Sequence, residues 1–172
     1  MNYDPEIHHR RSIRLQGYDY SQSGKYYVTI CAQDKAHVFG QVVEGEMHLS
    51  EHGEIVALAW SDLPRRYPHI RLGAFVVMPN HVHGIIEIVG SGLRTRPYKS
   101  AKHGLPEIVR GFKTYSARHL NEIRGTAGRP LWQRNYYEHI IRNDDELNKI
   151  REYISTNPLR WASDPENLTG RV

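Results

Sequence analysis

Two histidines separated by one residue are the first side chains in this chain whose types and spacing suit chemistry. His81 and His83 open an apolar segment that follows Pro79 and Asn80. A β-strand turns successive side chains to opposite faces, so both imidazoles project from one face and Val82 projects from the other. Two imidazoles on a rigid strand form half of a divalent-metal site. The same pattern is also compatible with a purely structural role in a buried strand.

Established histidine-containing metal sites make different demands on the surrounding sequence. A nucleotide hydrolase with alternating histidines needs a third histidine at position 85, where this chain has Ile85. A zincin places its histidines four residues apart on a helix, with a glutamate beside the first, and the sequence contains no such run. The single cysteine, Cys31, excludes a cysteine-based zinc site. A third ligand from a separate helix stays open.

A tyrosine and an asparagine near the end of the chain form a second candidate group. The capping-box pattern that starts at Asn143 predicts a helix, which we expect to end near Asn157 because Pro158 disfavours helical geometry in the residue before it. Tyr153 and Asn157 are four residues apart and share one border of the apolar stripe. An amide oxygen with two imidazoles suits Mg²⁺ or Mn²⁺ shared with phosphate oxygens. A phenol beside such a cation can attack phosphorus.

The elements that must position these residues predict one domain over residues 1–172, with a short tail at 160–172. We expect strands or hairpins at 25–32, 38–49, 67–78, 81–89 and shortly before 142, and helices at 50–65, 105–124 and 143–157. This order predicts an α+β fold, one mainly antiparallel sheet covered by helices, of ferredoxin-like kind. The apolar runs are too short to span a membrane. The missing signal pattern and the single cysteine favour the cytoplasm.

Basic residues are concentrated in three segments of the chain. The net charge is +4, from 23 Lys and Arg against 19 Asp and Glu, which favours a polyanionic partner. The segments are an N-terminal arm (1–16), a Gly/Ser-rich loop (90–104) and one side of the 105–124 helix. A charged outer face is typical of any amphipathic helix, but almost every charge on this side is positive. We therefore expect phosphate contacts there.

Several motifs together resemble the single-tyrosine transposases of the HUH (His-hydrophobic-His) endonuclease superfamily, and most closely their REP-associated branch. The motifs that carry the resemblance are Met78–His83, Leu131–Gln133, Tyr137–Arg142 and Tyr153–Pro158. Two N-terminal segments, Arg11–Tyr20 and Tyr27–Cys31, are also similar to this branch. The resemblance runs in order through about residues 10 to 160 and implies the ferredoxin-like HUH endonuclease fold.

The resemblance implies a complete set of roles. His81 and His83 would bind the metal, Mg²⁺ or Mn²⁺, and Asn157 would complete the ligand set. Tyr153 would attack a scissile phosphate of single-stranded DNA, leaving a 5′-phosphotyrosine and a free 3′-OH. Family substrates are imperfect palindromes that fold into hairpins. Their backbone would contact Arg10, Arg11, Arg14, Arg94, Arg96, Arg110, Lys113 and Arg118.

Some features stay open at this point. His139 is a candidate for a supporting role beside the site or a DNA contact, although a structural histidine is the plainer interpretation. The protein is expected to act at the nucleoid, as a monomer or a homodimer, with no membrane partner. Two other functions fit the same motifs: a non-catalytic relative that binds DNA hairpins, and a metal-dependent nuclease that hydrolyses with water.

Overall fold

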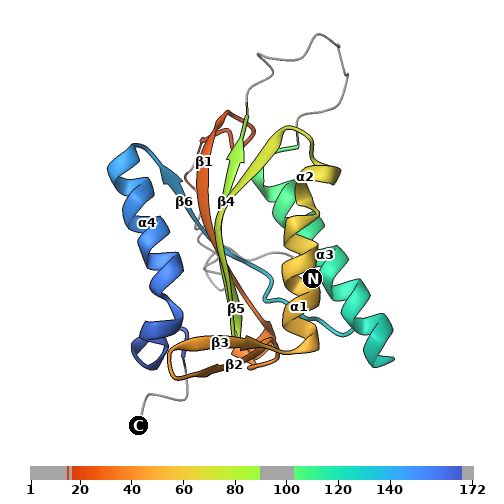
Figure 1. Cartoon of the computed structure of the whole chain (residues 1–172). Coiled ribbons are helices and arrows are strands. Elements are labelled where there is room, and N and C mark those ends of the chain that lie inside the picture. The colour runs from red at the N-terminus through yellow and green to blue at the C-terminus, as the bar shows by residue number, and fades with distance from the viewer. Residues whose placement is uncertain (1–14, 16, 90–102, 168–172) are drawn as a thin grey trace, which may run out of the picture.

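The computed structural model describes residue 15, residues 17–89 and residues 103–167 (Figure 1). The strands are β1 (Gly24–Cys31), β2 (Gly40–Val43), β3 (Glu46–Leu49), β4 (Ile70–Met78), β5 (His81–Ile88) and β6 (Tyr137–Ile141). The α-helices are α1 (Glu51–Ser61), α2 (Leu63–Arg66), α3 (Leu105–Arg124) and α4 (Asp144–Thr156). Two short 3₁₀ helices, η1 (Gln33–Lys35) and η2 (Pro158–Ser163), complete the described elements.

One four-stranded antiparallel sheet, in the order β4-β5-β1-β6, organises the fold. Helices α1 and α3 cover one face and α4 lies on the other (Figure 1). Counting only the strands of this sheet, the order is second, third, first and fourth, which is the strand order of a ferredoxin-like βαββαβ unit. The predicted α+β class is therefore confirmed. The β2–β3 hairpin forms a separate two-stranded sheet.

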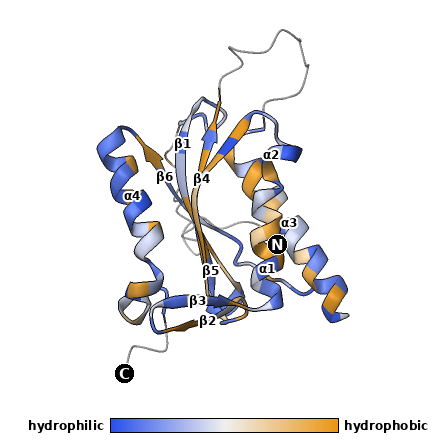
Figure 2. Cartoon of the chain, viewed as in Figure 1, coloured by the Kyte–Doolittle hydropathy of each residue, from blue (hydrophilic) through white to orange (hydrophobic). Residues whose placement is uncertain are grey.

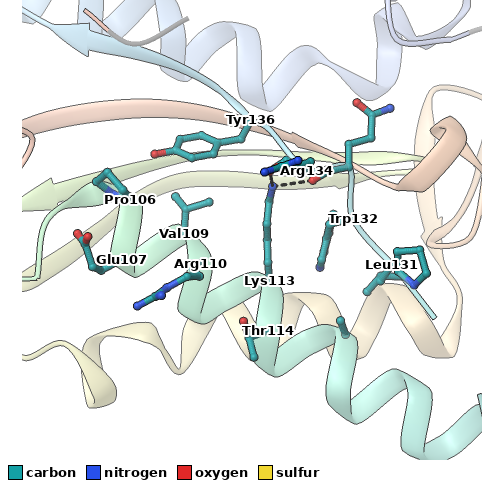
Figure 3. A pocket seen from close by; sticks show the side chains of 13 residues that line it. Pro106, Glu107, Val109, Arg110, Lys113, Thr114, Leu131, Trp132, Arg134 and Tyr136 are labelled. Carbon is teal, nitrogen blue, oxygen red and sulfur yellow. Dashed lines mark hydrogen bonds between the residues drawn. The ribbon is translucent and has the colours of Figure 1, made fainter. Parts of the chain in front are cut away.

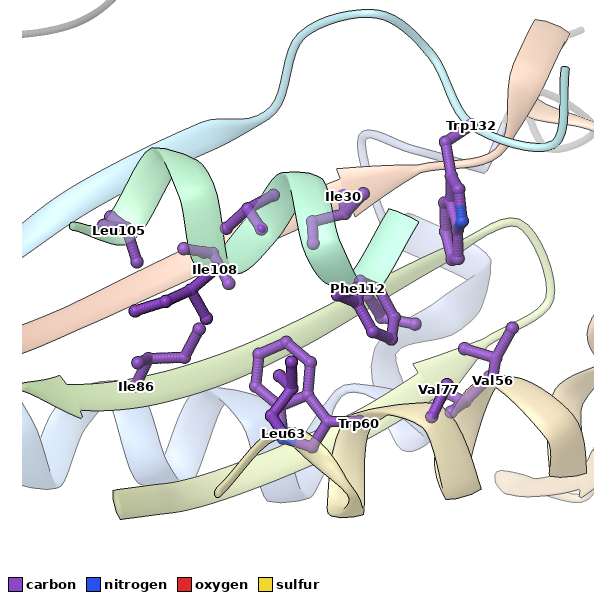
Figure 4. Packing of buried hydrophobic residues seen from close by; sticks show 14 of the residues in the cluster. Ile30, Val56, Trp60, Leu63, Val77, Ile86, Leu105, Ile108, Phe112 and Trp132 are labelled. Carbon is purple, nitrogen blue, oxygen red and sulfur yellow. The ribbon is translucent and has the colours of Figure 1, made fainter. Parts of the chain in front are cut away.

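The central strand β1 shows how the sequence separates the two faces. Tyr26, Val28 and Ile30 are fully buried in the main core against α1 and α3. Figure 4 shows this core, in which Trp60 and Phe112 meet edge to face with ring centroids 5.4 Å apart. The alternate side chains of β1 point to the face of α4. The candidate site residues lie on that second face.

Hydropathy follows the same layers. In Figure 2 the hydrophobic colouring is concentrated in β4, β5 and α1, whereas α4 is largely hydrophilic. The apolar side of α4 is narrow, with Leu147 and Ile154 buried against Tyr27 and Ile85 of the sheet. A helix with so small an apolar contact leaves room beside it for polar groups against the same face.

The helix predicted at 50–65 is interrupted in the structure. Ser50 caps it as expected, because its hydroxyl accepts from the backbone N–H of Gly53 at 3.2 Å. The helix divides at Asp62, and Pro64 then lies in the first turn of α2, where a missing N–H costs nothing. The predicted 105–124 helix is confirmed, and it ends at Gly125 in a left-handed conformation with φ of 63°.

Within the described residues, no helix is long and apolar enough to cross a membrane. The basic arm and most of the basic loop were expected to contact DNA. Arg10, Arg11, Arg14, Arg94 and Arg96 lie outside the described residues.

Candidate active site

His81 and His83 lie together on the α4 face of β5, as their spacing predicts. Their side chains are 0 % and 2 % exposed. In the antiparallel register, His81 is opposite Cys31 and His83 is opposite Thr29. The two Nε2 atoms face each other at 2.9 Å. The pleat of one strand therefore brings two imidazole nitrogens to a single point.

The Nδ1 atoms of the two rings have partners on the opposite side. His81 Nδ1 lies 2.8 Å from Oδ1 of Asn80. His83 Nδ1 lies 2.7 Å from the Tyr27 hydroxyl and 2.9 Å from the Thr29 hydroxyl. Both rings are thus oriented by hydrogen bonds, which is how metal-binding histidines are usually held.

Helix α4 brings the predicted nucleophile to the same place. Asn143 caps the helix by accepting from the backbone N–H of Glu146 at 2.8 Å. The ring of Tyr153 lies 5.3 Å from the ring of His83 and 6.4 Å from the ring of Tyr27, between centroids. The structure therefore places Tyr153 beside the histidine pair, although about 70 residues separate them in the sequence.

An acidic residue that sequence reasoning missed also lies at the pair. Asp164 follows η2, and its carboxylate has an oxygen that lies within 4.8 Å of both histidine donor atoms, all three groups being buried. The carboxylate accepts from the Asn157 amide at 3.0 Å and from the backbone N–H of Glu166 at 2.7 Å. Asp164 lies in the segment that was expected to be only a short tail, and a lone aspartate in a segment without periodicity gives no signal in the sequence.

Asn157, the predicted third ligand, is 1 % exposed, and its side chain is hydrogen-bonded to the Asp164 carboxylate. A carboxylate accepts only, so the amide nitrogen of Asn157 must face Asp164. The amide oxygen Oδ1 is buried and has no hydrogen-bond partner among the described residues. A buried oxygen without a partner is costly, and a cation is one group that can satisfy it.

The donor set fits a divalent metal on two counts. Two ligands at about 2.1 Å from one cation and at a right angle to each other are about 3.0 Å apart, and the two Nε2 atoms are 2.9 Å apart. The set also combines two imidazoles with the Asp164 carboxylate and the unpartnered oxygen of Asn157. Mixed nitrogen and oxygen ligands of this kind suit Mn²⁺ better than Mg²⁺, which prefers oxygen alone.

Burial sets the protonation of the site. It lowers the pKa of both His81 and His83 to about 3, with nearby positive charge from Lys35 adding to the effect on His81. Both rings are therefore neutral at pH 7 and offer lone pairs. Burial raises the pKa of Tyr153, the negative charge of Asp164 raises it further, and the Asn157 amide acts in the opposite direction. Tyr153 is a neutral phenol in this environment.

Other tyrosines that compete for the role of nucleophile lie elsewhere. Tyr115 is 38 % exposed on α3, with the Arg66 guanidinium 3.5 Å above its ring. Tyr137 is 54 % exposed on β6, and its ring lies 6.2 Å from that of Tyr27. Tyr137 is therefore an exposed phenol whose ring lies near that of Tyr27, which also contacts His83.

His139 connects two elements of the fold. It lies opposite Tyr27 in the β1–β6 pairing, and its Nε2 atom contacts the Glu146 carboxylate at the start of α4. The other oxygen of that carboxylate accepts from the Arg142 backbone N–H at 2.8 Å, and this bond is the main reason that the pKa of Glu146 is lowered. The described contacts of His139 thus hold α4 to the sheet edge.

The basic side chains of α3 differ in how they are used. Arg110 and Arg118 are exposed. The Lys113 ammonium group donates to the backbone carbonyls of Gln133, Arg134 and Asn135, at distances of 2.8, 3.3 and 2.9 Å. All three of its protons have acceptors within the protein. A phosphate would have to compete for Lys113, whereas the two arginines face solvent.

A pocket of about 540 Å³ lies between α3 and the segment 130–136 (Figure 3). Arg110, Lys113, Trp132, Arg134 and Tyr136 contribute to its lining. Because α3 covers the face opposite α4, this pocket and the histidine pair belong to different sides of the sheet (Figure 1).

Comparison with known proteins agrees with this fold. Residues 20–157 match the family model described as "Transposase IS200 like". The chain is 42 % identical over 176 residues to an uncharacterized protein of Haemophilus influenzae, covering 94 % of this chain and 95 % of that one. It is 24 % identical over 147 residues to a second protein of the same organism, named as a candidate REP-associated tyrosine transposase, covering 83 % and 74 %.

A solved structure of a REP-associated tyrosine transposase bound to a REP hairpin superposes with a TM-score of 0.55, at 19 % identity, over 88 % of this chain and 80 % of that chain. The chain belongs to the IS200-like transposase family. The predicted resemblance to the REP-associated tyrosine transposases is confirmed at the level of family and fold.

Proposed function

We propose that this protein is a metal-dependent, single-tyrosine DNA strand-transferase. One observation carries the proposal: Tyr153 lies beside His83, with ring centroids 5.3 Å apart, at the edge of a buried cluster that fits a divalent cation. A family of transposases supplies the context. The proximity of Tyr153 to the candidate cation site supports phosphoryl transfer, because that reaction requires the nucleophile and the cation to be neighbours.

His81, His83 and Asp164 would hold the cation, Mn²⁺ or Mg²⁺, and Asn157 would supply a further oxygen or orient the carboxylate. The cation polarises a phosphoryl oxygen and stabilises the negative charge that develops in the transition state. The low pKa values keep both imidazoles neutral at pH 7, so that each ring has one nitrogen with a free lone pair. The rings are kept oriented by the hydrogen-bond partners of their Nδ1 atoms, which are Asn80 for His81 and Tyr27 and Thr29 for His83.

Tyr153 would attack the phosphorus of one phosphodiester. Its hydroxyl oxygen forms the new P–O bond as it loses its proton, the bond from phosphorus to the 3′ oxygen breaks, and the leaving 3′ oxygen takes up a proton. The products are a 5′-phosphotyrosine and a free 3′-OH. Exchange of one phosphodiester for another retains the bond energy, so a 3′-OH can rejoin the strand without ATP.

Hairpin-forming single-stranded DNA is the proposed substrate, with repetitive palindromes as its source. The structural relative is described as bound to a REP hairpin. On this chain, Arg110 and Arg118 offer exposed guanidinium groups to phosphates. The basic residues of the arm and loop, most of which lie outside the described residues, are proposed to add further phosphate contacts. The protein would act at the nucleoid in the cytoplasm, as a monomer or a homodimer.

A covalent-capture assay tests the tyrosine mechanism. Labelled single-stranded hairpin DNA is incubated with the protein and Mn²⁺ or Mg²⁺, and the products are separated on a denaturing gel. We expect a labelled protein band that is absent from the Tyr153→Phe variant and retained in the Tyr137→Phe variant. Tyr137 is the matched control because it is the other phenol near Tyr27.

The same gel separates the two alternative functions. Cleavage that survives Tyr153→Phe without a protein–DNA band would contradict the tyrosine mechanism and indicate hydrolysis by water. Binding of the hairpin without cleavage under any metal condition would indicate a non-catalytic hairpin-binding protein.

A further inference from the structure

The side chain of Asn80, in the turn between β4 and β5, is fully buried beside His81. Its amide nitrogen donates to the backbone carbonyl of Lys35 at 3.2 Å and to that of Glu166 at 2.8 Å. A carbonyl oxygen only accepts, so the NH₂ group must face these two atoms. The amide oxygen of Asn80 must then face His81.

This orientation decides where His81 carries its proton. Oδ1 of Asn80 only accepts, and it lies 2.8 Å from Nδ1 of His81. In the neutral ring, Nδ1 must therefore carry the hydrogen and Nε2 must be unprotonated. Nε2 is the atom that lies 2.9 Å from its counterpart on His83. One amide group thus leaves the His81 lone pair directed at the proposed cation position.

His83 differs from His81 in this respect. Its Nδ1 atom faces the hydroxyls of Tyr27 and Thr29, at 2.7 and 2.9 Å. A hydroxyl both donates and accepts, so these partners accommodate either neutral form of His83. Without a cation, His83 Nε2–H can donate to the bare Nε2 of His81 while Nδ1 accepts from a hydroxyl. With a cation, the hydrogen lies on Nδ1 and the net proton count of the ring is unchanged.

We propose that Asn80 is a positioning residue that fixes His81 in the Nδ1–H form, so that its Nε2 atom is always available to the cation. His83, in contrast, would change from the Nε2–H form to the Nδ1–H form when the cation binds. The proposal rests on the metal centre proposed above. Through its nitrogen, the same side chain also holds the main chain at Glu166, two residues from Asp164. Asn80 thereby connects the histidine strand with the segment that supplies the acidic group.

A simpler role for Asn80 would be to form the turn. Asparagine favours turns partly because it tolerates positive φ. Among the described residues, the non-glycine positions with positive φ are Asp34, Lys35 and Glu44, so the turn backbone does not require an asparagine at position 80. The side chain is directed into the protein, where all its described hydrogen bonds are made.

Nitrogen-15 NMR of the metal-free protein tests the assignment, because long-range ¹⁵N–¹H spectra distinguish the two neutral forms of each imidazole. Spectra of His81→Gln and His83→Gln assign the two rings among eleven histidines. We expect His81 as the Nδ1–H form in the wild type, where the amide oxygen of Asn80 accepts from it. In Asn80→Ala we expect loss of that preference. His81 in the Nε2–H form in the wild type, or an unchanged Nδ1–H form in Asn80→Ala, would overturn the proposal.

Binding of Mn²⁺, measured by electron paramagnetic resonance without DNA, gives a second readout. We expect Asn80→Ala to bind Mn²⁺ about 10- to 100-fold more weakly, the usual effect of removing a group that orients a metal ligand. Ser116→Ala is the control, because it also removes a fully buried hydrogen-bonding side chain, from α3 on the other face. Near-ultraviolet circular dichroism confirms that each variant is folded. Equal Mn²⁺ affinity in Asn80→Ala and the wild type would contradict the proposal.

The outcome is separable from that of the strand-transfer proposal. If the covalent protein–DNA band is absent but the His81 form and the Mn²⁺ data are as expected, the role of Asn80 stands and the tyrosine mechanism fails. If the covalent band forms but His81 is in the Nε2–H form, the tyrosine mechanism stands and the proposed role of Asn80 fails.

Discussion

At the scale of single residues, burial of two histidines couples protonation to folding. His81 and His83 have pKa values near 3 in the folded protein, against 6.5 for an unperturbed histidine. Between these values the unfolded chain takes up protons that the folded chain does not. The free energy of unfolding therefore falls as the pH is lowered below 6.5, by up to about 1.4 kcal/mol per pH unit for each histidine.

We predict this loss for the metal-free protein between pH 6.5 and 5, measured by urea unfolding. The slope should decrease in His83→Gln, which removes one of the two groups. His119→Gln is the control, because it removes a histidine of α3 whose side chain is 49 % exposed rather than buried. Equal slopes in all three proteins would contradict neutral, buried histidines.

Asp164 gives a second prediction at this scale. Its negative charge raises the pKa of Tyr153 and its carboxylate is one of the three clustered donors. Asp164→Asn should therefore lower the pKa of Tyr153 and weaken Mn²⁺ binding by at least about tenfold. Carbon-13 NMR of the tyrosine Cζ atoms measures the first effect and calorimetry the second. Asp145→Asn, an exposed position on α4, should change neither, and a variant of Asp164 that binds Mn²⁺ normally would remove it from the ligand set.

Sequence reasoning reached some of these residues because they follow a period. The alternation of a strand placed His81 and His83 on one face, and the helical period placed Tyr153 beside Asn157. Asp164 follows no period. Its position depends on tertiary contacts, namely the bonds from Asn80 to the Glu166 carbonyl and from Lys35 to the Glu166 carboxylate, each 2.8 Å long. Contacts between segments so far apart are not encoded in a local pattern.

At the scale of elements, the cap of α4 controls the helix that carries Tyr153. Asn143 accepts from the Glu146 backbone N–H, and loss of such a cap costs about 1 kcal/mol. We predict that Asn143→Ala lowers the free energy of unfolding by about that amount, measured in urea. Asn148→Ala, on an exposed position of the same helix, should cost no more than about 0.5 kcal/mol. Equal effects would show that the cap contributes nothing.

Close packing on the other face constrains β5 as well. A Cβ atom on Gly84 would lie 2.3 Å from Cζ2 of Trp60, whose ring is stacked on Phe75 with centroids 4.6 Å apart. Gly84→Ala should therefore lower the free energy of unfolding by about 1–3 kcal/mol or more, as overpacking does. Gly24→Ala is the matched control, because its nearest contact would be 3.4 Å. A Gly84→Ala protein as stable as the control would mean that the Trp60 ring moves freely.

The elements themselves were largely predictable, with exceptions that have clear causes. Runs rich in β-branched, aromatic and other apolar residues indicated β1, β4 and β5, and the apolar stripe of α3 predicted its full length. The break at Asp62 was missed because the apolar pattern continues across it to Leu63. The helix η2 was missed because it is short and contains no buried residue to create a pattern.

At the scale of the whole molecule, the distribution of positive charge predicts how DNA binding depends on salt. Each phosphate contact contributes about 0.7 to 0.9 to the slope of log affinity against log salt concentration. Arg110→Ala and Arg118→Ala, both exposed on α3, should each reduce the slope by about one contact, measured by fluorescence anisotropy with hairpin DNA. Arg65→Ala on α2, whose side chain is 86 % exposed, is the control. Unchanged slopes for both α3 variants would exclude this helix from the interface.

The sequence predicts some of the strand pairings in the sheet but not the complete strand order. The connection between β4 and β5 is so short that the two strands must pair as a hairpin. Pairing of β1 with β6 joins Tyr27 to His139, more than 100 residues later, and only the assembled core determines it.

The wide spacing of the site along the chain also has a consequence for biosynthesis. The histidines come from β5, the tyrosine from α4, and Asp164 from the last described segment. A ribosome that has released the chain only as far as β5 has exposed the imidazole pair without Tyr153, Asn157 or Asp164. The nascent protein at that stage lacks the proposed nucleophile and the acidic group, so the proposed centre is complete only after η2 and the residues that follow it have been synthesised.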